Sequence, residues 1–485
     1  MLLSENLLLL ASLLVFVAIM VSKVGSKLGA PSLLVFLLLG MAAGTDGFGL
    51  RFDNYEMAES IGYFAMTIIL FSAGFETSFT ETRPVFKKGV VLSTLGVLLT
   101  VILTGIFIWI TVGRMANMGV LVCFMLAAVM GSTDSASVFS ILREKKLHLR
   151  ENLSPLLELE SGSNDPMAYT LTIVLVKTLT SEDTLSNGPW PIVGSAILVL
   201  VVQIVVGLAV GIAMGYATKW LLERVHFSSF AITAILILSV GFFTNGITSM
   251  LRGNGLLALY VAAIIIGNKA RLTQKKEMIH FFDGLTWLMQ LTMFLILGLL
   301  ARPSQMLPLI LPALLIGLFM MLVARPASVY LCLLPFRDLS FQAKTFVSWV
   351  GLKGAGPILF ALCPVVAGLE RSSEMFNIVF IITLFSLLVR GMTLGKMANL
   401  LKLSYDEEPR TETFGMEIPE EMGMTRAHVV TPEDLAFGTT LRDLHLPHGI
   451  RVMMVKRSDQ FLVPHGSMEL QPGDHLIIII GESDD

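Results

Sequence analysis

The feature that most constrains this chain is a series of long apolar stretches, which recur from the N-terminus to about residue 400. A helix that crosses a bilayer needs about 20 largely apolar residues. Thirteen stretches approach or exceed that length, and 54% of the chain is hydrophobic while 15% is charged. They lie at about 5–22, 30–45, 58–76, 86–112, 117–142, 153–179, 190–222, 228–250, 254–268, 281–301, 305–334, 341–368 and 374–400. The sequence therefore predicts an all-α polytopic membrane protein with 13 transmembrane helices.

The basic residues of the loops predict an orientation for these helices. If the N-terminus lies outside and the helices alternate in direction, most loop lysines and arginines fall on the cytoplasmic side, among them Lys145, Lys146 and Arg150. The positive-inside rule favours this arrangement. Because thirteen is an odd number, the C-terminus is then cytoplasmic.

Two interruptions in corresponding helices predict an inverted repeat of six, one and six segments. The fifth predicted helix contains Gly131–Asp134 and the twelfth contains Gly351–Pro357, where glycines and a proline disfavour a continuous helix. A sequence echo between 31–44 and 255–268 agrees with the repeat. Paired interrupted helices are the best sequence indicator of a site in a secondary transporter. We therefore expect two broken helices that cross near the membrane midplane.

Acidic residues occur in these segments, where lipid would otherwise exclude them. Asp134 follows Thr133 in the fifth helix, and Asp165 lies in the sixth. Ser161 stands one helical turn before Asp165, and Asn164 stands beside it. Carboxylate, hydroxyl and amide oxygens suit a hard cation such as K⁺ or Na⁺. Burial disfavours a charged carboxylate and a nearby cation favours it, so Asp165, with Asp134 nearby, is expected to exchange a proton for a metal ion.

Basic residues also lie within the apolar segments. Arg325 needs an acidic partner, and Glu160 is the expected one in a structural ion pair. Lys353, at the twelfth-helix interruption, suits the negative C-terminal end of a broken helix. Arg390 lies near the cytoplasmic end of the last helix, where we expect its side chain to extend toward water.

The chain changes character after the last apolar stretch. Residues 1–403 are the predicted transmembrane exchanger domain, and polar residues 404–425 read as a linker. Short β-like runs follow at 427–431, 450–457, 460–464 and 475–481, separated by turn residues. We expect a small cytosolic α+β regulatory domain at 426–485.

Several functional classes find no support in the sequence. A net charge of −3 gives no nucleic-acid footprint, and the three cysteines, all in apolar runs, have no disulfide or metal-binding spacing. No nucleophile–base pair is evident, so we expect neither enzymatic activity nor a cofactor.

The motifs together resemble the monovalent cation/proton antiporter family, on its electroneutral Na⁺/H⁺ and K⁺/H⁺ branch. The resemblance covers about residues 1–400 and is carried by TD at 133–134, E-S-x-x-N-D at 160–165, RP at 325–326 and GLKGAGPI at 351–358. It implies that Asp165 is the shared ligand of cation and proton. Assisting ligands would be the Thr133 backbone, Asp134 and Ser161. It also implies the Glu160–Arg325 pair and a homodimer embedded in membrane lipid.

The tail resembles the C-terminal half of the regulatory domains of potassium channels and transporters, known as RCK_C or TrkA-C domains. The runs TLRDLHLPHGIRV (440–452) and LQPGDHLIIIIG (470–481) carry this likeness, which allows for a small-molecule ligand on the tail. The combination is similar to bacterial inner-membrane K⁺/H⁺ antiporters linked to pH, potassium and cell-volume homeostasis. Ser72 stands where some sodium-selective relatives have a glutamate.

Two functions therefore remain in view. The first is electroneutral exchange of K⁺ for H⁺ by alternating access, with Na⁺ as an alternative cation. The second is a cation channel gated by the tail. No TVGYG-like filter is present, whereas buried acids in the helices favour exchange.

Overall fold

The computed structural model separates into two compact units, Met1–Tyr405 and Asp406–Asp485, which are described one at a time. The structure describes residues 2–27, 31–115, 117–145, 147–180, 189–225, 229–272, 274–406, 424–431, 434–435, 438–444, 450–457 and 460–480. Most of the predicted linker, residues 407–423, lies outside these ranges.

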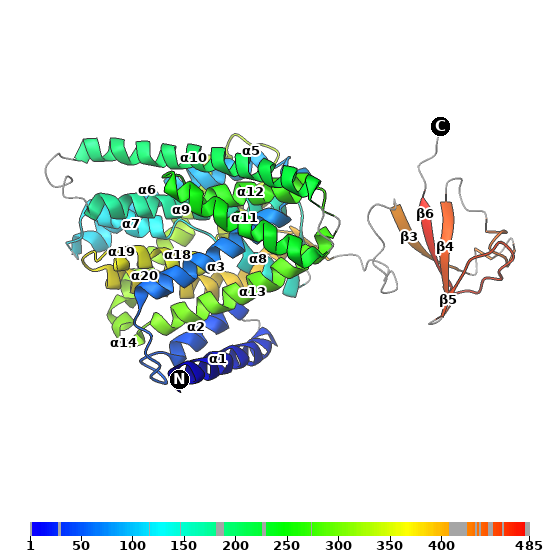
Figure 1. The fold of residues 1–485 in the computed structure, drawn as a ribbon, viewed down its shortest axis with the longest axis horizontal. Coiled ribbons are helices and arrows are strands. Elements are labelled where there is room, and N and C mark those ends of the chain that lie inside the picture. Colours follow the sequence, from blue (N-terminus) through cyan, green and yellow to red (C-terminus); the bar gives the residue numbers. More distant parts are fainter. Residues whose placement is uncertain are drawn as a thin grey trace. The chain divides into compact units, whose positions relative to one another are not determined.

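The first unit is built almost entirely of helices (Figure 1). They are α1 (Leu2–Lys27), α2 (Ser32–Ala43), α3 (Tyr55–Glu76), α4 (Phe79–Thr82), α5 (Phe86–Val91), α6 (Val97–Ile108), α7 (Val120–Val129), α8 (Ser135–Glu144), α9 (Leu153–Thr180), α10 (Pro189–Arg224) and α11 (Phe230–Met250). They continue with α12 (Gly255–Lys269), α13 (Lys275–Leu300), α14 (Pro303–Met306), α15 (Ile310–Phe319), α16 (Arg325–Leu333), α17 (Phe341–Val350), α18 (Ala355–Phe360), α19 (Leu362–Val366), α20 (Ser372–Ser386) and α21 (Met392–Leu400).

Wide π-helical turns join several of these helices into longer rods. They are η1 (Leu92–Gly96), η2 (Trp109–Gly113), η5 (Met320–Ala324) and η6 (Leu387–Gly391), and a 3₁₀ turn, η4 (Leu307–Leu309), precedes α15. Such turns are rare and often occur at functional sites. Two of them, η5 and η6, contribute groups to the site described below.

Seven of the described helices are long and apolar enough to cross a membrane by length and composition, or eight if α17 and the helices after it form one bent span. Shorter apolar helices include α2, α7 and α12. α9 is long enough, but its acidic and polar residues lower its hydropathy. A polytopic helical architecture is thus present, whereas the number thirteen and the inverted repeat stay predictions.

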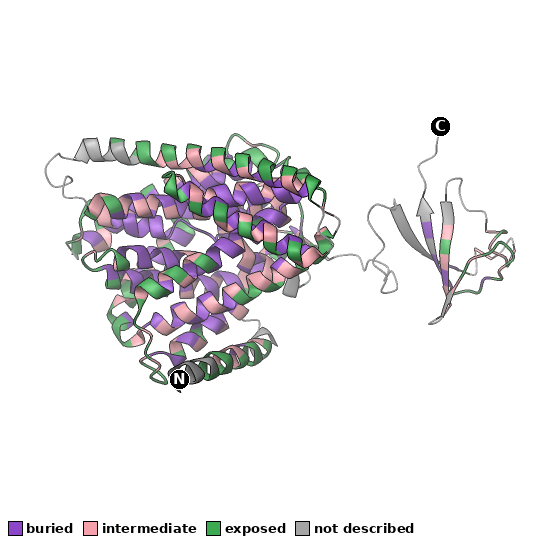
Figure 2. Cartoon of the chain, viewed as in Figure 1, coloured by how far each residue is buried: buried purple, intermediate pink, exposed green. Residues whose placement is uncertain are grey.

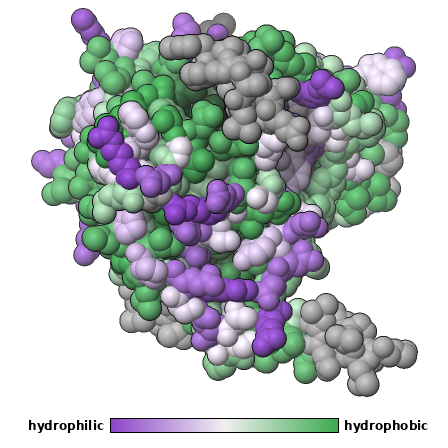
Figure 3. Space-filling view, turned by 90° about the vertical axis from the view of Figure 1, so that its left-hand side faces the viewer, coloured by the Kyte–Doolittle hydropathy of each residue, from purple (hydrophilic) through white to green (hydrophobic). Residues whose placement is uncertain are grey.

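Burial follows the membrane interpretation. Figure 2 shows buried residues along the central helices, while α10 at the edge is exposed over much of its length. Figure 3 shows one end of the unit, where polar side chains gather through the middle and lower part of the face, with apolar ones above and to both sides. An apolar perimeter is what lipid contact requires, because lipid cannot satisfy polar groups.

Small residues let the helices approach closely. α2 and α13 cross at Gly40 and Gly298, where an added Cβ at Gly40 would lie 2.3 Å from the Leu295 carbonyl oxygen. Contacts of this kind drive helix association in membranes, where the hydrophobic effect between helices is absent. α9 packs against α5, α7, α10 and α12, so it lies inside the unit.

The only paired strands of the first unit, among its described residues, are β1 (Leu147–Leu149) and β2 (Ser404–Asp406). The second unit contains an antiparallel sheet in the order β3-β6-β4-β5, from β3 (Met424–Val429), β4 (Ile450–Arg457), β5 (Gln460–Leu462) and β6 (His475–Ile480). The predicted β-like runs fall on these strands. No helix occurs among the described residues of this unit, so its α+β class stays a prediction.

Candidate cation site

The candidate site begins with the polar face of α9. Ser161 and Asp165 lie one turn apart, and Asn164 lies next to Asp165. All three side chains bond to the stretch between α7 and α8. The Ser132 hydroxyl donates to Asp165 Oδ1, and the Ser161 hydroxyl donates to the Thr133 carbonyl oxygen at 2.6 Å. The predicted residues of α9 therefore meet the first broken helix.

The first break joins α7 to α8 through residues in non-helical backbone. Asn164 binds Thr133 twice, accepting from its backbone N–H at 3.3 Å and donating to its hydroxyl at 2.5 Å. Asp134 caps α8, because its Oδ1 accepts from the Ser137 backbone N–H at 3.0 Å. A carboxylate is favourable there, at the positive end of the helix dipole.

The second break joins α17 to α18 and crosses the first. The Asp134 backbone N–H donates to the Leu352 carbonyl oxygen at 3.0 Å, so the two interrupted chains bond directly. Gly354 lies against Asp134, where an added Cβ would come within 1.9 Å of Asp134 Oδ2. Only glycine leaves room for this approach. The bend between the helices is 45°.

Lys353 is buried at this crossing, with 5% of its surface exposed. Its ammonium donates to the Ser132 carbonyl oxygen at 2.8 Å, and its backbone N–H donates to the Ser386 hydroxyl at 3.0 Å. The Lys353 ammonium therefore binds a carbonyl oxygen of the first break, not of its own. The predicted counter-charge at its own helix end, the C-terminus of α17, comes from another residue.

That residue is Arg390, and the sequence interpretation of it was wrong. Arg390 is 3% exposed and does not extend to water. Its guanidinium donates to the Gly351 carbonyl oxygen, which ends α17, and to the Met321 carbonyl oxygen at 3.3 Å. The reason is positional, since the π turn η6 and the packing of α20 direct the side chain inward.

Glu160 and Arg325 form a buried ion pair, with Arg325 Nη2 2.5 Å from Glu160 Oε1. The side chains are 2% and 7% exposed. Each charge needs the other, because an unpaired ion in this environment costs several kcal/mol. The pair links α9 to α16 beside the site and leaves Asp165 free of that role.

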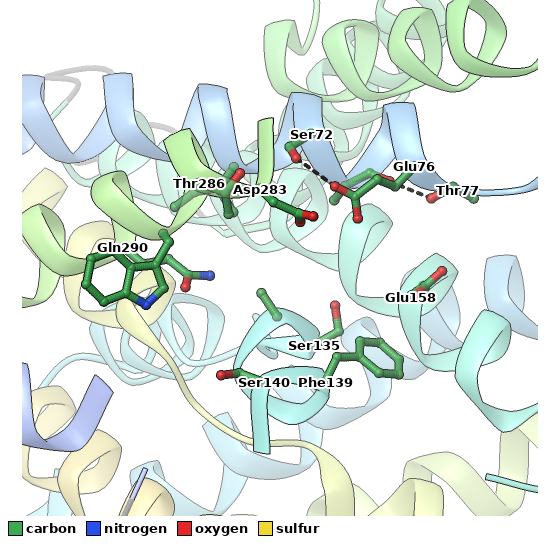
Figure 4. A pocket seen from close by; sticks show the side chains of 14 residues that line it. Ser72, Glu76, Thr77, Ser135, Phe139, Ser140, Glu158, Asp283, Thr286 and Gln290 are labelled. Atoms are coloured by element: carbon green, nitrogen blue, oxygen red, sulfur yellow. Dashed lines mark hydrogen bonds between the residues drawn. The ribbon is translucent and has the colours of Figure 1, made fainter. Parts of the chain in front are cut away.

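A cavity of about 300 Å³ lies beside α8, where Ser135 and Ala136 line it next to the first break. Figure 4 shows Glu76 on α3 and Asp283 on α13 on one side of the cavity and Ser135, the residue after Asp134, on the other. Glu158 of α9 also lines the cavity. None of the described residues that line it is a lysine or arginine. The cavity therefore carries three acidic side chains in a partly apolar lining and lies adjacent to the first break.

An aromatic cluster begins one helical turn after Asp165. Tyr169 lies one turn further along α9, with its ring centroid 5.7 Å from that of Tyr63 and 5.5 Å from that of Phe360. The Tyr63 hydroxyl donates to Asn245 Oδ1 at 3.0 Å. The site thus lies between an acidic cavity beside α8 and an aromatic cluster further along α9.

The structure brings together Thr133, Asp134, Ser161, Asn164, Asp165 and Lys353, with Glu160 and Arg325 alongside. Sequence reasoning missed Ser132 and the cavity acids Glu76 and Asp283, and it misplaced Arg390. Ser132 stood within the noted GSTD run, so its proximity to Asp165 was accessible. The cavity acids come from helices distant in sequence and carried no local signal. No cluster of three or more metal-ligating His, Cys, Asp or Glu side chains occurs in the described part of the chain.

Comparison with known proteins identifies the class of the chain. Residues 12–400 match the family described as "Sodium/hydrogen exchanger, transmembrane". The chain belongs to the sodium/hydrogen exchanger family. The exchanger's residues 426–484 match the TrkA-C domain. The resemblance of both parts is therefore confirmed, and the exchanger is a multi-pass membrane antiporter of cations and protons, from a transport family and not a family of catalytic enzymes.

Similar proteins share most of the exchanger's length. The "K(+)/H(+) antiporter NhaP2" of Shewanella sp. (strain ANA-3) is 35% identical over 477 residues, covering 97% of this chain and 80% of that protein. The "K(+)/H(+) antiporter NhaP" of Alkalimonas amylolytica is 34% identical over 486 residues, covering 98% and 81%. The sodium proton antiporter MjNhaP1 of Methanocaldococcus jannaschii shares the fold, with a TM-score of 0.68, 21% identity, and coverage of 80% of this chain and 97% of that one.

Proposed function

We propose that the exchanger moves K⁺ in exchange for H⁺, with both ions competing for Asp165. The observation that carries this proposal is the convergence of Asp165, Asp134 and the Thr133 carbonyl oxygen at the crossing of two broken helices. Hard oxygen ligands suit an alkali cation, and the same carboxylate binds a proton when the cation leaves. Ser161 and Asn164 hold the ligands in place.

Competition at one carboxylate accounts for electroneutral exchange. K⁺ and H⁺ each carry one positive charge, so a site that holds one or the other has the same charge in both loaded forms. Glu160 is paired with Arg325, which leaves it outside this competition. Residue 164 is an asparagine, which does not titrate. An aspartate there would add a second titrating acid beside Asp165.

The two sides of the site support alternating access. The acidic cavity lies beside Ser135, the neighbour of Asp134, while Tyr63, Tyr169 and Phe360 form the aromatic cluster after Asp165. With the orientation that the basic loops predict, the cavity opens to the cytoplasm and the rings face outside. In this proposal the cavity is the cytoplasmic approach to the site, and transport requires it to close while the rings part.

K⁺ is the proposed cation, with Na⁺ as the alternative. The named function of the two bacterial relatives is K⁺/H⁺ antiport, and both align over nearly the whole chain. Ser72 lines the cavity, and its hydroxyl donates to the Glu76 carboxylate at 3.1 Å. Position 72 therefore carries a neutral hydroxyl and not the glutamate of some sodium-selective relatives.

The setting we propose is a bacterial inner membrane, with the N-terminus outside and the tail in the cytoplasm. There the exchanger works as a homodimer in lipid and contributes to pH, potassium and cell-volume homeostasis. Residues 1–403 form the exchanger domain, 404–425 the linker and 426–485 the regulatory domain. The tail adjusts activity in response to a small-molecule ligand.

The test is Asp165→Asn in everted vesicles. The variant should insert and fold but lose K⁺-dependent proton release entirely, because an amide neither titrates nor supplies a charged ligand. K⁺, Na⁺ and Li⁺ titrations of the wild type establish selectivity. Persistent exchange in the variant contradicts the site, and single-channel currents in the wild type would indicate the tail-gated channel instead.

A further inference from the structure

The side chain of Arg390 joins two irregular segments that flank the cation site. It leaves the π turn η6 and reaches the carbonyl oxygens of Gly351, at the end of α17, and Met321, within the π turn η5. Within the described chain, its hydrogen-bond partners are these two carbonyls and include no carboxylate. A buried guanidinium that binds only backbone carbonyls is an expensive arrangement, so a role beyond packing is indicated.

The first of these carbonyls controls the second break. Gly351 is two residues before Lys353, whose ammonium holds the Ser132 carbonyl oxygen. Ser132 in turn donates to Asp165. Fixing the Gly351 carbonyl therefore fixes the direction from which Lys353 approaches the first break, and with it the position of the Ser132 hydroxyl on the carboxylate.

The second carbonyl connects the same side chain to the ion pair. Met321 is four residues before Arg325, which pairs with Glu160 on α9. Arg390 consequently lies between two chains of contacts that both return to α9, one at Glu160 and one at Asp165. Lysine at this position keeps the charge but lacks the planar fork that reaches two carbonyls at once.

We propose that Arg390 is a positioning residue for the cation site, acting through Gly351 and Lys353. It touches neither of the proposed ion-binding carboxylates. The charged groups that face this region are Lys353 and Arg325 with Glu160, and beyond Ser132 the site acids Asp165 and Asp134. This inference rests on the proposed exchange at Asp165.

The variants Arg390→Lys and Arg390→Gln separate the fork from the charge. In proteoliposomes of the full chain, both should lower the maximal K⁺/H⁺ exchange rate about tenfold or more, by analogy with other losses of positioning. Only Arg390→Gln removes a positive charge, which favours proton binding at the site. Its pH–rate curve should therefore move to higher pH by roughly half a unit or more, while that of Arg390→Lys should not.

Controls distinguish failure of this inference from failure of the proposed function. Lys396→Gln changes an exposed base on α21 and should behave as wild type. Absence of exchange in the wild type, or its persistence in Asp165→Asn, would contradict the proposed function. Wild-type rates in Arg390→Lys, with wild type active and Asp165→Asn inactive, would overturn the role of Arg390 alone.

A double-mutant cycle tests the route through Lys353. The readout is the K⁺-dependent rise in the thermal midpoint of the purified full chain, which is measurable in variants that do not transport. Arg390→Lys should reduce this rise in the wild-type background and change it little in a Lys353→Ala background. Equal reductions in both backgrounds would show that Arg390 acts independently of Lys353, and unchanged pH curves for both Arg390 variants would reduce it to packing.

Discussion

At the scale of single residues, the buried ion pair of the membrane unit holds each charge beside a partner of opposite charge. Glu160 and Arg325 are both buried and lie within 2.5 Å of each other. Such a pair need not add net stability, but removal of one partner leaves an isolated charge. Substitution of this pair therefore tests its structural role without changing Asp165, the proposed ion-binding carboxylate.

Replacement of Glu160 by glutamine should destabilise the chain by about 3–5 kcal/mol, because Arg325 then stays buried without a counter-charge. Thermal unfolding of the detergent-purified full chain measures the loss. The double variant Glu160→Gln, Arg325→Gln removes both charges and should recover most of the stability. A double variant less stable than Glu160→Gln would contradict the pairing.

At the scale of elements, the crossing of the two breaks depends on a glycine, because it has no Cβ. Gly354 lies against Asp134, and the wall of the site on this side has no room for a methyl group. Because the close neighbour is the side chain that caps α8, the clash would act on the cap and on the ion site together.

Gly354→Ala should lower exchange at least about tenfold, since the added Cβ displaces Asp134 from the α8 terminus. Proton-flux assays on equal amounts of inserted protein measure this. Gly246→Ala on α11 is the matched control, because nothing lies within 4 Å of its added Cβ. Equal activity of the two variants would show that the crossing tolerates a wider separation.

Particular residues show how far the sequence could be interpreted. Helical periodicity was enough to place Ser161, Asn164 and Asp165 on one side of α9, and glycines marked both breaks. The prediction that Arg390 extends toward water was wrong, because it assumed a regular last helix. The π turn within that helix turns the side chain inward, and π turns have no clear sequence signature.

The cavity was beyond sequence reasoning for a different reason. Glu76, Glu158 and Asp283 lie on three helices, and their shared cavity depends on how those helices pack. None of the three acids belongs to a local sequence pattern that indicates a shared cavity. Tertiary placement, which no local pattern encodes, turns them into one acidic surface.

At the scale of the whole molecule, the chain combines a membrane unit and a tail with a small core of its own. Val430, Val455, Leu470 and Leu476 are buried between the strands of the tail. Asp474 is 2% exposed and accepts from Arg457 Nε at 2.9 Å and Nη2 at 2.7 Å. Arg457 holds the pKa of Asp474 below its ordinary value of 3.8.

The lowered pKa makes the stabilisation by this pair dependent on pH. Stabilisation is complete above pH 3.8 and is lost as the pH falls through the lower folded-state value. Asp474→Asn should therefore cost about 2 kcal/mol at pH 7. Hydrogen exchange of β4 and β6 in the full chain measures the loss. Glu469→Gln, which changes an exposed neighbour, should leave hydrogen exchange of β4 and β6 unchanged. Equal protection of these strands in both variants would contradict the stabilising role of the Asp474–Arg457 pair.

The bond from the Asp134 backbone N–H to the Leu352 carbonyl oxygen has a consequence for genetics. Both partners belong to the main chain, so no ordinary substitution except proline at 134 deletes the donor. Alanine at position 134 or 352 keeps both atoms of the bond, so substitution of these two side chains does not by itself delete the link. Replacing the amide at residue 134 with an ester, by unnatural-residue incorporation, is the direct way to sever it.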